Sequence, residues 1–440
     1  MAHEAAIERL AGLVRVPTVS RVEAETTDWA AFDRLRSVLE AQYPLVHARL
    51  ERELVAERTL VYRWAGRDPA AAPVLLLAHQ DVVDPGEPAD WAHDPFGAEI
   101  DGDTMHGRGT IDDKGSLAAI LEAVETLLAE GHVPGRDVIL VFGHDEETHG
   151  SGARAAAAML QQRGVRPVLV LDEGGAIVEG ALPGTVRPMA VIGIAEKGIA
   201  TVRLRVAGRG GHASTPPEIS AIGRLARAIA RIDEHPFPAR LTDATRKMFA
   251  AAGQAATGIR GLLYRNVGWT GPLLRRALAR GGDEISAMVR TTRVATRVSG
   301  GHAHNAVPER AEATVNVRIL AGETIASTLA RLRAIVRDPL VEMEADGSEP
   351  SPISPTDGPG WELVTGALAE VRPDVVPTPY GQTGATDARS FTGLTPAVYR
   401  FTPFHLTAGE RAALHAVGER IRLSSWLAGI EYYRALLGRV

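Results

Sequence analysis

The chain has 440 residues, of which 45% are hydrophobic, carries a formal net charge of −6 and contains no cysteine. A chain of this length is longer than a single hydrophobic core ordinarily supports, so we expect two domains. The mild negative charge argues against nucleic acid as the main partner, because phosphate binding needs a basic face. The absence of cysteine excludes disulfides and thiolate ligands, which leaves His, Asp and Glu as candidate metal ligands.

Residues 1–9 have the pattern of an acidic amphipathic helix and lack the basic and apolar regions of a signal peptide. No apolar run approaches the roughly 18 residues that span a bilayer. We therefore expect a cytoplasmic protein without a membrane partner.

Helix and strand patterns alternate from the N-terminus to about residue 191, which predicts an α/β fold with a doubly wound, mostly parallel sheet. Residues 114–130 form a predicted helix whose apolar residues lie on one side. Residues 153–163 supply the next predicted crossover helix.

After residue 198 the pattern changes to an alternating strand at 200–206, followed by a helix at about 217–232. A second strand and helix follow at 311–320 and 324–336. We predict a smaller α/β sandwich, a lid or dimerisation domain, inserted into the catalytic domain. The predicted boundaries are 1–198 for the first catalytic segment, 199–345 for the inserted domain and 346–440 for the second catalytic segment.

The Arg-rich stretch 236–284 is predicted to be helical, but its sequence indicates no role. The Pro and Ser cluster at 349–355 is typical of a linker, here back to the catalytic domain. Residues 361–371 and 415–437 are predicted helices that complete that domain.

Three short apolar runs each end in polar residues that bind metals. Residues 74–78 precede His79-Gln80-Asp81, residues 138–142 precede Asp145-Glu146-Glu147, and residues 168–171 precede Asp172-Glu173. Such runs are typical of strands buried on both faces of a parallel sheet, and ligands bind beyond the carboxyl ends of such strands. The three strand ends therefore predict one shared metal site.

Five motifs occur in order along the chain. They are His79-Gln80-Asp81-Val82-Val83, residues 107–115, Asp145-Glu146-Glu147, Gly211-His212-Ala213-Ser214 and His415-Ala416-Val417-Gly418-Glu419. Any one motif alone would be weak, but together they resemble the dinuclear zinc peptidase and deacylase family, which includes aminoacylase, acetylornithine deacetylase, succinyl-diaminopimelate desuccinylase, glutamate carboxypeptidase and yeast carboxypeptidase S. The resemblance covers nearly the whole chain and is closest to the carboxypeptidase S and N-acyl amino acid hydrolase branch.

The resemblance implies two zinc ions, with cobalt or manganese as possible substitutes, and a water that bridges them. It implies that Asp112 bridges both ions, that His79 and Asp172 bind one, and that Glu147 and His415 bind the other. Two alternatives stay open. Glu173 rivals Asp172 as a ligand, and His405 rivals His415, because the family commonly has Asn where Gly418 stands.

The resemblance also implies catalytic roles close to the metal. Glu146 would be the general base that takes the proton of the water. Asp81 would orient His79. The peptide bond between Asp112 and Asp113 would be cis. The alternative for residues 145–147 is an acidic helix N-terminus without a catalytic role.

Further residues resemble substrate contacts of the family. His212 resembles the catalytic residue that reaches the scissile carbonyl from the partner subunit of a dimer. Asn305 and Arg318 resemble residues that bind the substrate carboxylate, although Arg318 could equally be an ordinary surface arginine. Two more, Gly384 and Thr386, lie with Asp387 in a segment that resembles the glycine-rich loop under the substrate; a plain turn is the alternative.

We therefore expect a zinc-dependent amidohydrolase that acts on a small-molecule or short-peptide substrate, as a homodimer. It would cleave an amide bond next to a free amino acid carboxylate, in an N-acyl amino acid or a short peptide. A dipeptidase or aminopeptidase that recognises a free amine is one alternative. An inactive binding or scaffold relative is the alternative from another class.

Overall fold

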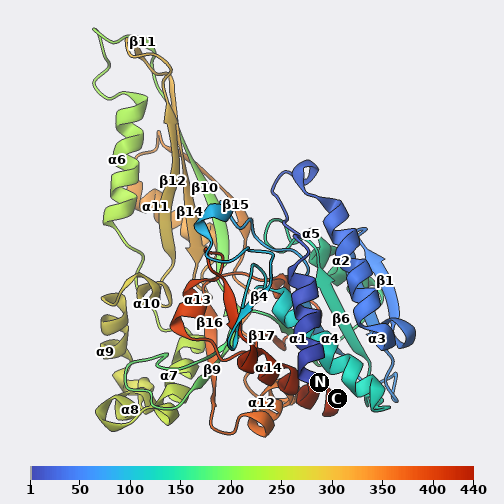
Figure 1. The fold of residues 1–440 in the computed structure, drawn as a ribbon. Helices are drawn as coiled ribbons and strands as arrows, with labels where there is room; N and C mark the ends of the chain where they lie inside the picture. Colours follow the sequence, from blue (N-terminus) through green and yellow to red (C-terminus); the bar gives the residue numbers. More distant parts are fainter. Residues whose placement is uncertain (1) are drawn as a thin grey trace.

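The structure, a computed structural model, describes residues 2–440. Figure 1 shows a large part built around a central sheet and an elongated lid that projects from it. The large sheet has the strand order β1-β2-β6-β3-β7-β17-β9-β16, and its central neighbours β6, β3, β7 and β17 are parallel. This confirms the predicted α/β class with a mostly parallel sheet. The strands are β1 (Glu51–Val55), β2 (Thr59–Trp64), β3 (Val74–His79), β6 (Val138–Gly143), β7 (Leu169–Asp172), β9 (Met189–Glu196), β16 (Val376–Gln382) and β17 (Val398–Arg400).

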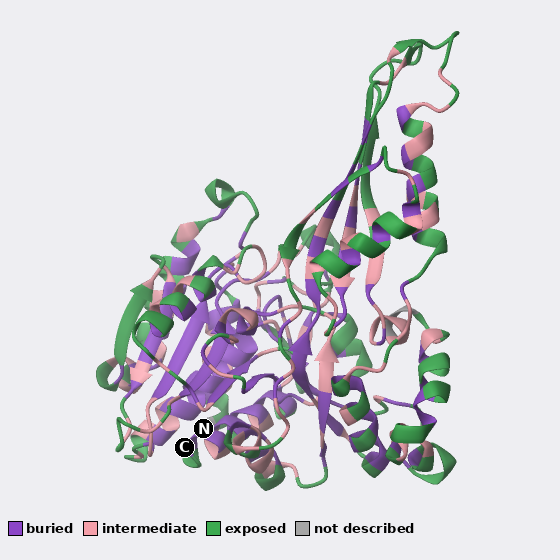
Figure 2. Ribbon diagram, turned by 180° about the vertical axis from the view of Figure 1, so that it is seen from behind, coloured by how far each residue is buried: buried purple, intermediate pink, exposed green. Residues whose placement is uncertain are grey.

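Helices cover both faces of this sheet, as the continuous apolar strands require. Along β3, Leu76 faces one core and Leu75 and Leu77 face the other, because successive side chains of a strand point to opposite faces. Figure 2 shows these strands buried throughout. One face is covered by α1 (Ala2–Val14), α2 (Trp29–Gln42), α3 (Pro44–Arg49), α4 (Lys114–Ala129), α12 (Pro359–Val371) and α14 (Leu423–Gly438), the other by α5 (Ser151–Gln162) and the short helix η3 (Asp387–Phe391).

The lid is a four-stranded antiparallel sheet in the order β12-β14-β10-β15, with α6 and α11 packed on one face. The two-stranded ribbon of β11 and β13 forms its far tip (Figure 1). The elements are β10 (Gly198–Ala207), β11 (Gly211–His212), α6 (Ala221–Glu234), β12 (Thr292–Gly300), β13 (Ala306–Val307), β14 (Arg310–Ile319), α11 (Ile325–Val336) and β15 (Glu342–Ser348).

The packing divides the chain differently from the predicted boundaries in one region. Helices α7 (Asp243–Ala255), α8 (Gly258–Arg265), α9 (Val267–Ala279) and α10 (Asp283–Ala287) confirm that the Arg-rich stretch is helical. They lie below the lid, beside the edge of the large sheet (Figure 1). There Met248 and Phe249 of α7 share a core with Met189 of β9 and Val376 of β16. These helices were predicted to belong to the inserted domain, yet their apolar faces are buried against the large sheet.

Smaller elements complete the large part: η1 (Ala24–Thr26), η2 (Pro88–Asp90), β4 (Glu99–Asp101), β5 (Thr104–His106), β8 (Ile177–Val178), α13 (Ala408–Ala412) and β18 (Arg420–Arg422). The predicted helix at 415–437 was wrong at its start. His415 lies in a loop with a φ of 58°, and the chain passes through Gly418, with a φ of 81°, into β18. Pairing of β18 with β5 stops α14 from extending back to His415.

Candidate metal centre

The carboxyl ends of β3, β6 and β7 meet at one edge of the large sheet, as the three polar strand ends predicted. His79, the last residue of β3, is paired in parallel register with Gly143, the last residue of β6. Leu76 of β3 is likewise paired with Leu171, next to the end of β7. Each strand therefore delivers the residues that follow it to the same place.

Asp112 lies at the centre of the resulting cluster. One carboxylate oxygen, Oδ1, is 2.9 Å from Nε2 of His79, and the other, Oδ2, is 2.8 Å from Nε2 of His415. Nε2 of His415 is also 3.3 Å from Oε1 of Glu147. Ligand atoms of His79, Asp112 and Glu147 all lie within 4.8 Å of one another. The peptide bond between Asp112 and Asp113 is cis, which confirms that prediction.

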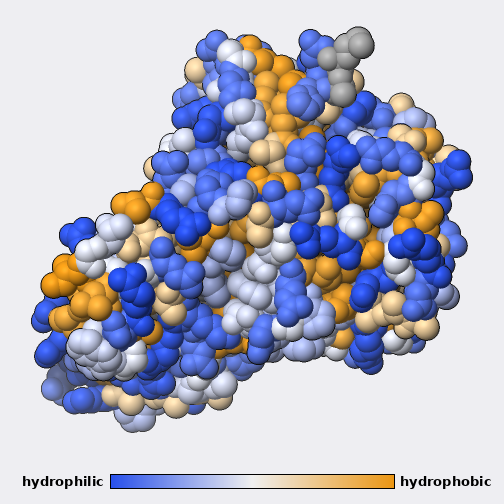
Figure 3. Space-filling model, turned by 90° about the horizontal axis from the view of Figure 1, so that it is seen from below, coloured by the Kyte–Doolittle hydropathy of each residue, from blue (hydrophilic) through white to orange (hydrophobic). Residues whose placement is uncertain are grey.

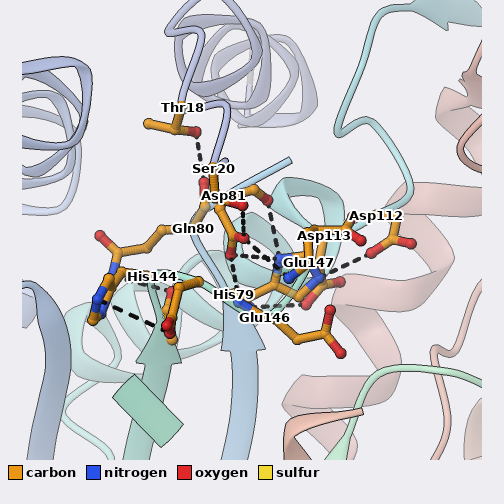
Figure 4. Close-up of polar contacts among 12 residues, drawn as sticks. Thr18, Ser20, His79, Gln80, Asp81, Asp112, Asp113, His144, Glu146 and Glu147 are labelled. Carbon is orange, nitrogen blue, oxygen red and sulfur yellow. Dashed lines mark hydrogen bonds and ion pairs between the residues drawn. The ribbon is translucent and has the colours of Figure 1, made fainter. Parts of the chain in front are cut away.

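Asp81 holds the loop that carries both glutamates. Its Oδ1 accepts a hydrogen bond from the backbone amide of Glu146, and its Oδ2 accepts one from that of Glu147, each at 3.1 Å. Ser20 donates its hydroxyl to Oδ2 at 2.6 Å. Nδ1 of His79 is 3.2 Å from Oδ1 of the same carboxylate and 3.0 Å from the Asp81 carbonyl (Figure 4). One buried carboxylate therefore orients a candidate ligand, a second candidate ligand and the candidate base.

The pKa values of the clustered side chains reflect an excess of carboxylates over histidines. Burial raises the pKa of Glu146 well above its ordinary value, and burial also raises that of Glu147. Burial would lower the pKa of His79, but the carboxylates of Asp112 and Asp81 outweigh it and raise that pKa well above the ordinary value. Two histidines facing more carboxylates than they can neutralise are typical of a site that binds cations.

The donor set fits metal ions. Imidazole nitrogens and carboxylate oxygens are the ligands that zinc accepts when thiolates are absent. The buried Oδ1 of Asp113 has no hydrogen-bond donor among the described residues, and the buried Oε1 of Glu147 has only the ion-pair contact with His415 at 3.3 Å. A buried oxygen of this kind is stabilised by a nearby cation.

Asp172 and Glu173, the two alternatives for one ligand position, lie at the carboxyl end of β7. Both oxygens of Asp172 accept backbone amides, Oδ1 from Glu173 at 2.9 Å and Oδ2 from Ala388 at 2.7 Å. Burial raises the pKa of Asp172 to about 6. Burial and then the charge of Asp112 raise the pKa of Glu173 well above its ordinary value. The charge of Asp172 acts on Asp113 of the cluster, and the charges of Asp112 and Asp113 act on Glu173. Both carboxylates therefore lie close enough to influence the cluster, and Asp172 and Glu173 stay alternatives for one ligand position.

The two histidines predicted as alternatives for one ligand position lie in different parts of the structure. His415 contacts Asp112 and Glu147 as described above. His405 has its Nε2 at 3.4 Å from Oε1 of Glu179 and lines a separate small cavity with Tyr432 and Arg422. The structure therefore brings His415, and not His405, to the cluster.

A cavity of about 1030 Å³ opens beside the cluster. It joins Glu146, Glu147 and His415 with several predicted substrate contacts, which are Arg318, Gly384 and Thr386, together with Asp387. Arg318 reaches it from β14 of the lid, where its Nε donates to Asn316 Oδ1 at 3.3 Å. The lid sheet and the metal edge of the large sheet thus share one cavity.

His212 and Asn305 are not at this cavity. His212 lies in β11 and Asn305 immediately precedes β13, so both lie at the exposed tip of the lid (Figure 1). The carbonyl of Asn305 accepts the backbone amide of Ala213 at 3.0 Å, and Nδ1 of His212 is 2.7 Å from the Ser214 hydroxyl. Neither residue can contribute to the metal cluster of its own chain in this arrangement.

The sequence did not predict a buried ionic network that supports the segment containing Gly384 and Thr386. The Glu196 carboxylate accepts hydrogen bonds from the amide and hydroxyl of Thr386, from Arg400 Nε at 2.8 Å and from Arg389 Nε at 3.2 Å. Glu196 is the last residue of β9 and was not among the predicted site residues. The two arginines carried no motif, so only the fold identifies this support for Thr386.

Glu419 was recognised only as the end of a motif, and the structure gives it a specific contact set. Its Oε1 accepts the backbone amides of Gly109, Ile111 and Asp112 at 2.9–3.2 Å. Its Oε2 is 2.6 Å from Nη1 of buried Arg108. This carboxylate ties the loop that carries Asp112 to the segment that carries His415.

Comparison with known proteins agrees with this geometry. Residues 75–439 match peptidase family M20/M25/M40. The chain is 33% identical to the human N-fatty-acyl-amino acid synthase/hydrolase PM20D1 over 440 residues, which cover 98% of this chain and 86% of the human protein. It is also 33% identical to the probable carboxypeptidase S-like 2 of Dictyostelium discoideum over 437 residues, with 98% and 84% covered.

The fold is similar to that of a solved M20 family metallo-carboxypeptidase, Sso-CP2 from Sulfolobus solfataricus, with a TM-score of 0.72 and 17% identity over 98% of both chains. The family match and the full-length relatives favour an active enzyme over the scaffold alternative. With its candidate metal cluster and its extended sequence match, the chain belongs to peptidase family M20/M25/M40 and is a metallohydrolase.

Proposed function

We propose that this enzyme hydrolyses the amide bond that joins an acyl group, or an aminoacyl residue, to an amino acid with a free carboxylate. The observation that carries the proposal is the pairing, in one cavity, of the carboxylate cluster with the guanidinium of Arg318. Among the described residues, no carboxylate lies within ion-pair distance of Arg318, and its polar contact is with Asn316. A half-buried, unpaired guanidinium fork matches a substrate carboxylate in charge and shape.

Two metal ions would be held by His79, Asp112, Glu147 and His415, with Asp172 or Glu173, and we propose zinc, with cobalt or manganese as substitutes. Bound zinc supplies Lewis acidity that lowers the pKa of water and polarises a carbonyl. The protein supplies the rest. Glu146 accepts the proton of the attacking water and donates it to the leaving nitrogen, and Asp81 fixes the backbone from which Glu146 projects. Arg318, Gly384 and Thr386 position the substrate.

The nature of the acyl group follows from the relatives. The human relative is named for N-fatty-acyl amino acids, so we propose a long-chain N-acyl amino acid as the first substrate class to test. The carboxypeptidase relatives support short peptides with a free C-terminus as the second class. An enzyme that recognises a free amine, a dipeptidase or aminopeptidase, is the competing proposal.

A hydrolysis panel separates these proposals. The zinc and cobalt forms are assayed with an N-acetyl amino acid, an N-long-acyl amino acid, a dipeptide and the C-terminal carboxamide of each. We expect hydrolysis of the N-acyl substrates. We expect no hydrolysis once their carboxylate is replaced by a carboxamide. Equal cleavage of the carboxamides, or cleavage only of compounds with a free amine, would contradict the proposal.

Glu146→Gln and Glu147→Ala are matched controls for the panel, because the two residues are neighbours with different roles. Glu146→Gln keeps the size of the side chain but cannot accept a proton, so turnover should fall about 10²- to 10⁴-fold while bound zinc is retained. Glu147→Ala should instead lower zinc occupancy. Loss of zinc from Glu146→Gln, or turnover close to that of the parent, would reject Glu146 as the base.

We further propose a homodimer in which His212 completes the site of the partner chain. Two observations support it: His212 lies at the tip of the lid, far from its own cluster, and β12 is a long edge strand of the lid sheet that exposes Val294 and Val298. A long edge strand presents unpaired backbone groups and is a template for pairing with another chain.

Mixing two inactive variants tests this dimer. In a heterodimer of His212→Ala and Glu146→Gln, one of the two sites has both its own Glu146 and the partner's His212 intact. Random re-association of equal amounts should therefore restore about a quarter of parental activity, because about half of the dimers are mixed. Full activity of His212→Ala alone, or no recovery in mixtures whose heterodimers are demonstrated by mass, would contradict the proposal.

A further inference from the structure

Helices α8 and α9 expose large apolar side chains to solvent. Trp269 and Leu273 lie one turn apart on α9 and are 73% and 58% exposed, and Ile259 and Leu262 of α8 are 74% and 52% exposed. These four residues define the α8–α9 surface. Of the six tryptophans, Trp269 is the one with an exposed side chain. Isolated exposed apolar residues are ordinary, but here two pairs, each one helical turn apart, lie on two helices that contact each other, and exposed apolar surface gathered in this way is typical of interaction sites.

The exposure is not the result of loose packing. The opposite sides of the same helices are buried, with Tyr264 of α8 and Leu274 and Leu278 of α9 in one core. The rings of Tyr264 and Phe249 of α7 are 5.3 Å apart. Helices α8 and α9 are therefore anchored through one side, and the α8–α9 surface is held outward.

The charge of this region is opposite to that of the whole protein. Residues 244–280 contain seven basic residues and no acidic residue, in a chain whose net charge is −6. Arg260, Arg275 and Arg276 are exposed, and none of them has a carboxylate partner among the side chains that the structure describes. Figure 3, which views the molecule from below, shows apolar side chains interspersed with hydrophilic ones on the lobe where these helices lie.

We propose that the α8–α9 surface docks the enzyme onto an anionic lipid bilayer. Tryptophan and aliphatic side chains enter the boundary between headgroups and acyl chains, and arginines pair with the lipid phosphates. Among residues 2–440, the structure shows no helix with the length and hydropathy needed to cross a membrane. This inference revises the expectation, from the sequence, of no membrane partner.

A second copy of this chain is a poorer occupant of the same surface. A two-fold interface places the same patch on both sides, so it would bring the unpaired arginines of both copies into one interface. Like charges brought together in this way oppose association. An anionic bilayer complements the apolar residues and the arginines together.

Vesicle flotation tests the proposal with two lipid compositions. The full-length parent is expected to float with vesicles of phosphatidylcholine mixed with phosphatidylglycerol, not with phosphatidylcholine alone, and the binding should weaken as salt is added. Tryptophan emission should shift to the blue on binding, and Trp269→Phe should remove that shift. Arg275→Glu/Arg276→Glu should weaken binding at least about 25-fold, since each basic residue near such a surface contributes about fivefold.

Leu340→Ser/Arg310→Glu is the matched control, because Leu340 and Arg310 are an exposed leucine and an exposed arginine of the lid. It should bind vesicles as the parent does, whereas Trp269→Ser/Leu273→Ser should not. Hydrolysis of a soluble short-acyl substrate, unchanged in all variants, verifies that they fold. Equal flotation with both lipid compositions, absence of flotation of the parent, or equal loss in the control would overturn the proposal. A drop in oligomer mass confined to the α8–α9 variants would identify a second copy as the occupant instead.

Discussion

Asp81→Asn should damage this enzyme more than any exposed carboxylate change, although it alters one atom. The two oxygens of Asp81 face different donors: Oδ1 faces the Glu146 amide, and Oδ2 faces the Glu147 amide and the Ser20 hydroxyl. Asparagine offers one oxygen and one NH₂ group. In either orientation, one loop amide faces another donor with no acceptor.

The expected loss of stability follows from the number of hydrogen bonds that the substitution removes. A hydrogen bond to a charged group contributes about 1.5–3 kcal/mol, and a buried amide left without an acceptor costs about 1–3 kcal/mol. Because contributions in one network are not additive, we expect the free energy of unfolding to fall by about 2–5 kcal/mol. That is a large part of the roughly 5–15 kcal/mol that stabilises a typical domain. Zinc affinity should fall about 10- to 100-fold, since His79 also loses its orienting carboxylate.

Urea unfolding followed by circular dichroism, in the presence of a chelator, measures the free energy of unfolding of the metal-free protein. A competitive zinc titration measures the affinity. Asp84→Asn is the control: Asp84 is half-exposed and pairs with Arg21 at 2.9 Å, so its loss should cost at most about 1 kcal/mol. Equal unfolding midpoints and equal zinc affinities for the two variants would refute the reasoning.

Three further predictions concern charge and metal. Glu419→Gln should lower the free energy of unfolding by about 3–5 kcal/mol, because buried Arg108 loses its partner, and urea unfolding would contradict this by showing a change under 1 kcal/mol. Burial, with a smaller effect of Arg318, lowers the pKa of Lys197 to about 8, so between about pH 8 and 10.5 the unfolded state binds more protons. Lys197→Met should therefore be more stable than the parent at pH 7, and the difference in melting temperature should shrink toward pH 10; a pH-independent difference would argue against a buried charged lysine. Removal of metal by a chelator should destabilise the protein by about 4 kcal/mol relative to zinc at 1,000 times its dissociation constant, whereas identical melting curves would exclude zinc binding to the native state.

The sequence by itself determined the sheet and the place of the site. Continuous apolar runs bury on two faces wherever they lie in the chain, so β3, β6 and β7 and the polar residues after them could be read directly. The family motifs added His415 and the cis bond at Asp112, and the helical nature of the Arg-rich stretch followed from its composition.

Only the tertiary structure decided which of the two candidate histidines faces the cluster. It also showed what supports the carboxylate at the end of β7, because the amide of Ala388, more than 200 residues away, donates to Asp172. His405 and His415 differ in the segments they pack against, and the packing of α7 on β16 takes the Arg-rich helices away from the lid. Buried partners such as Glu196 with Arg400 carry no local pattern, because their meeting depends on contacts between distant segments and not on the spacing of residues along the chain.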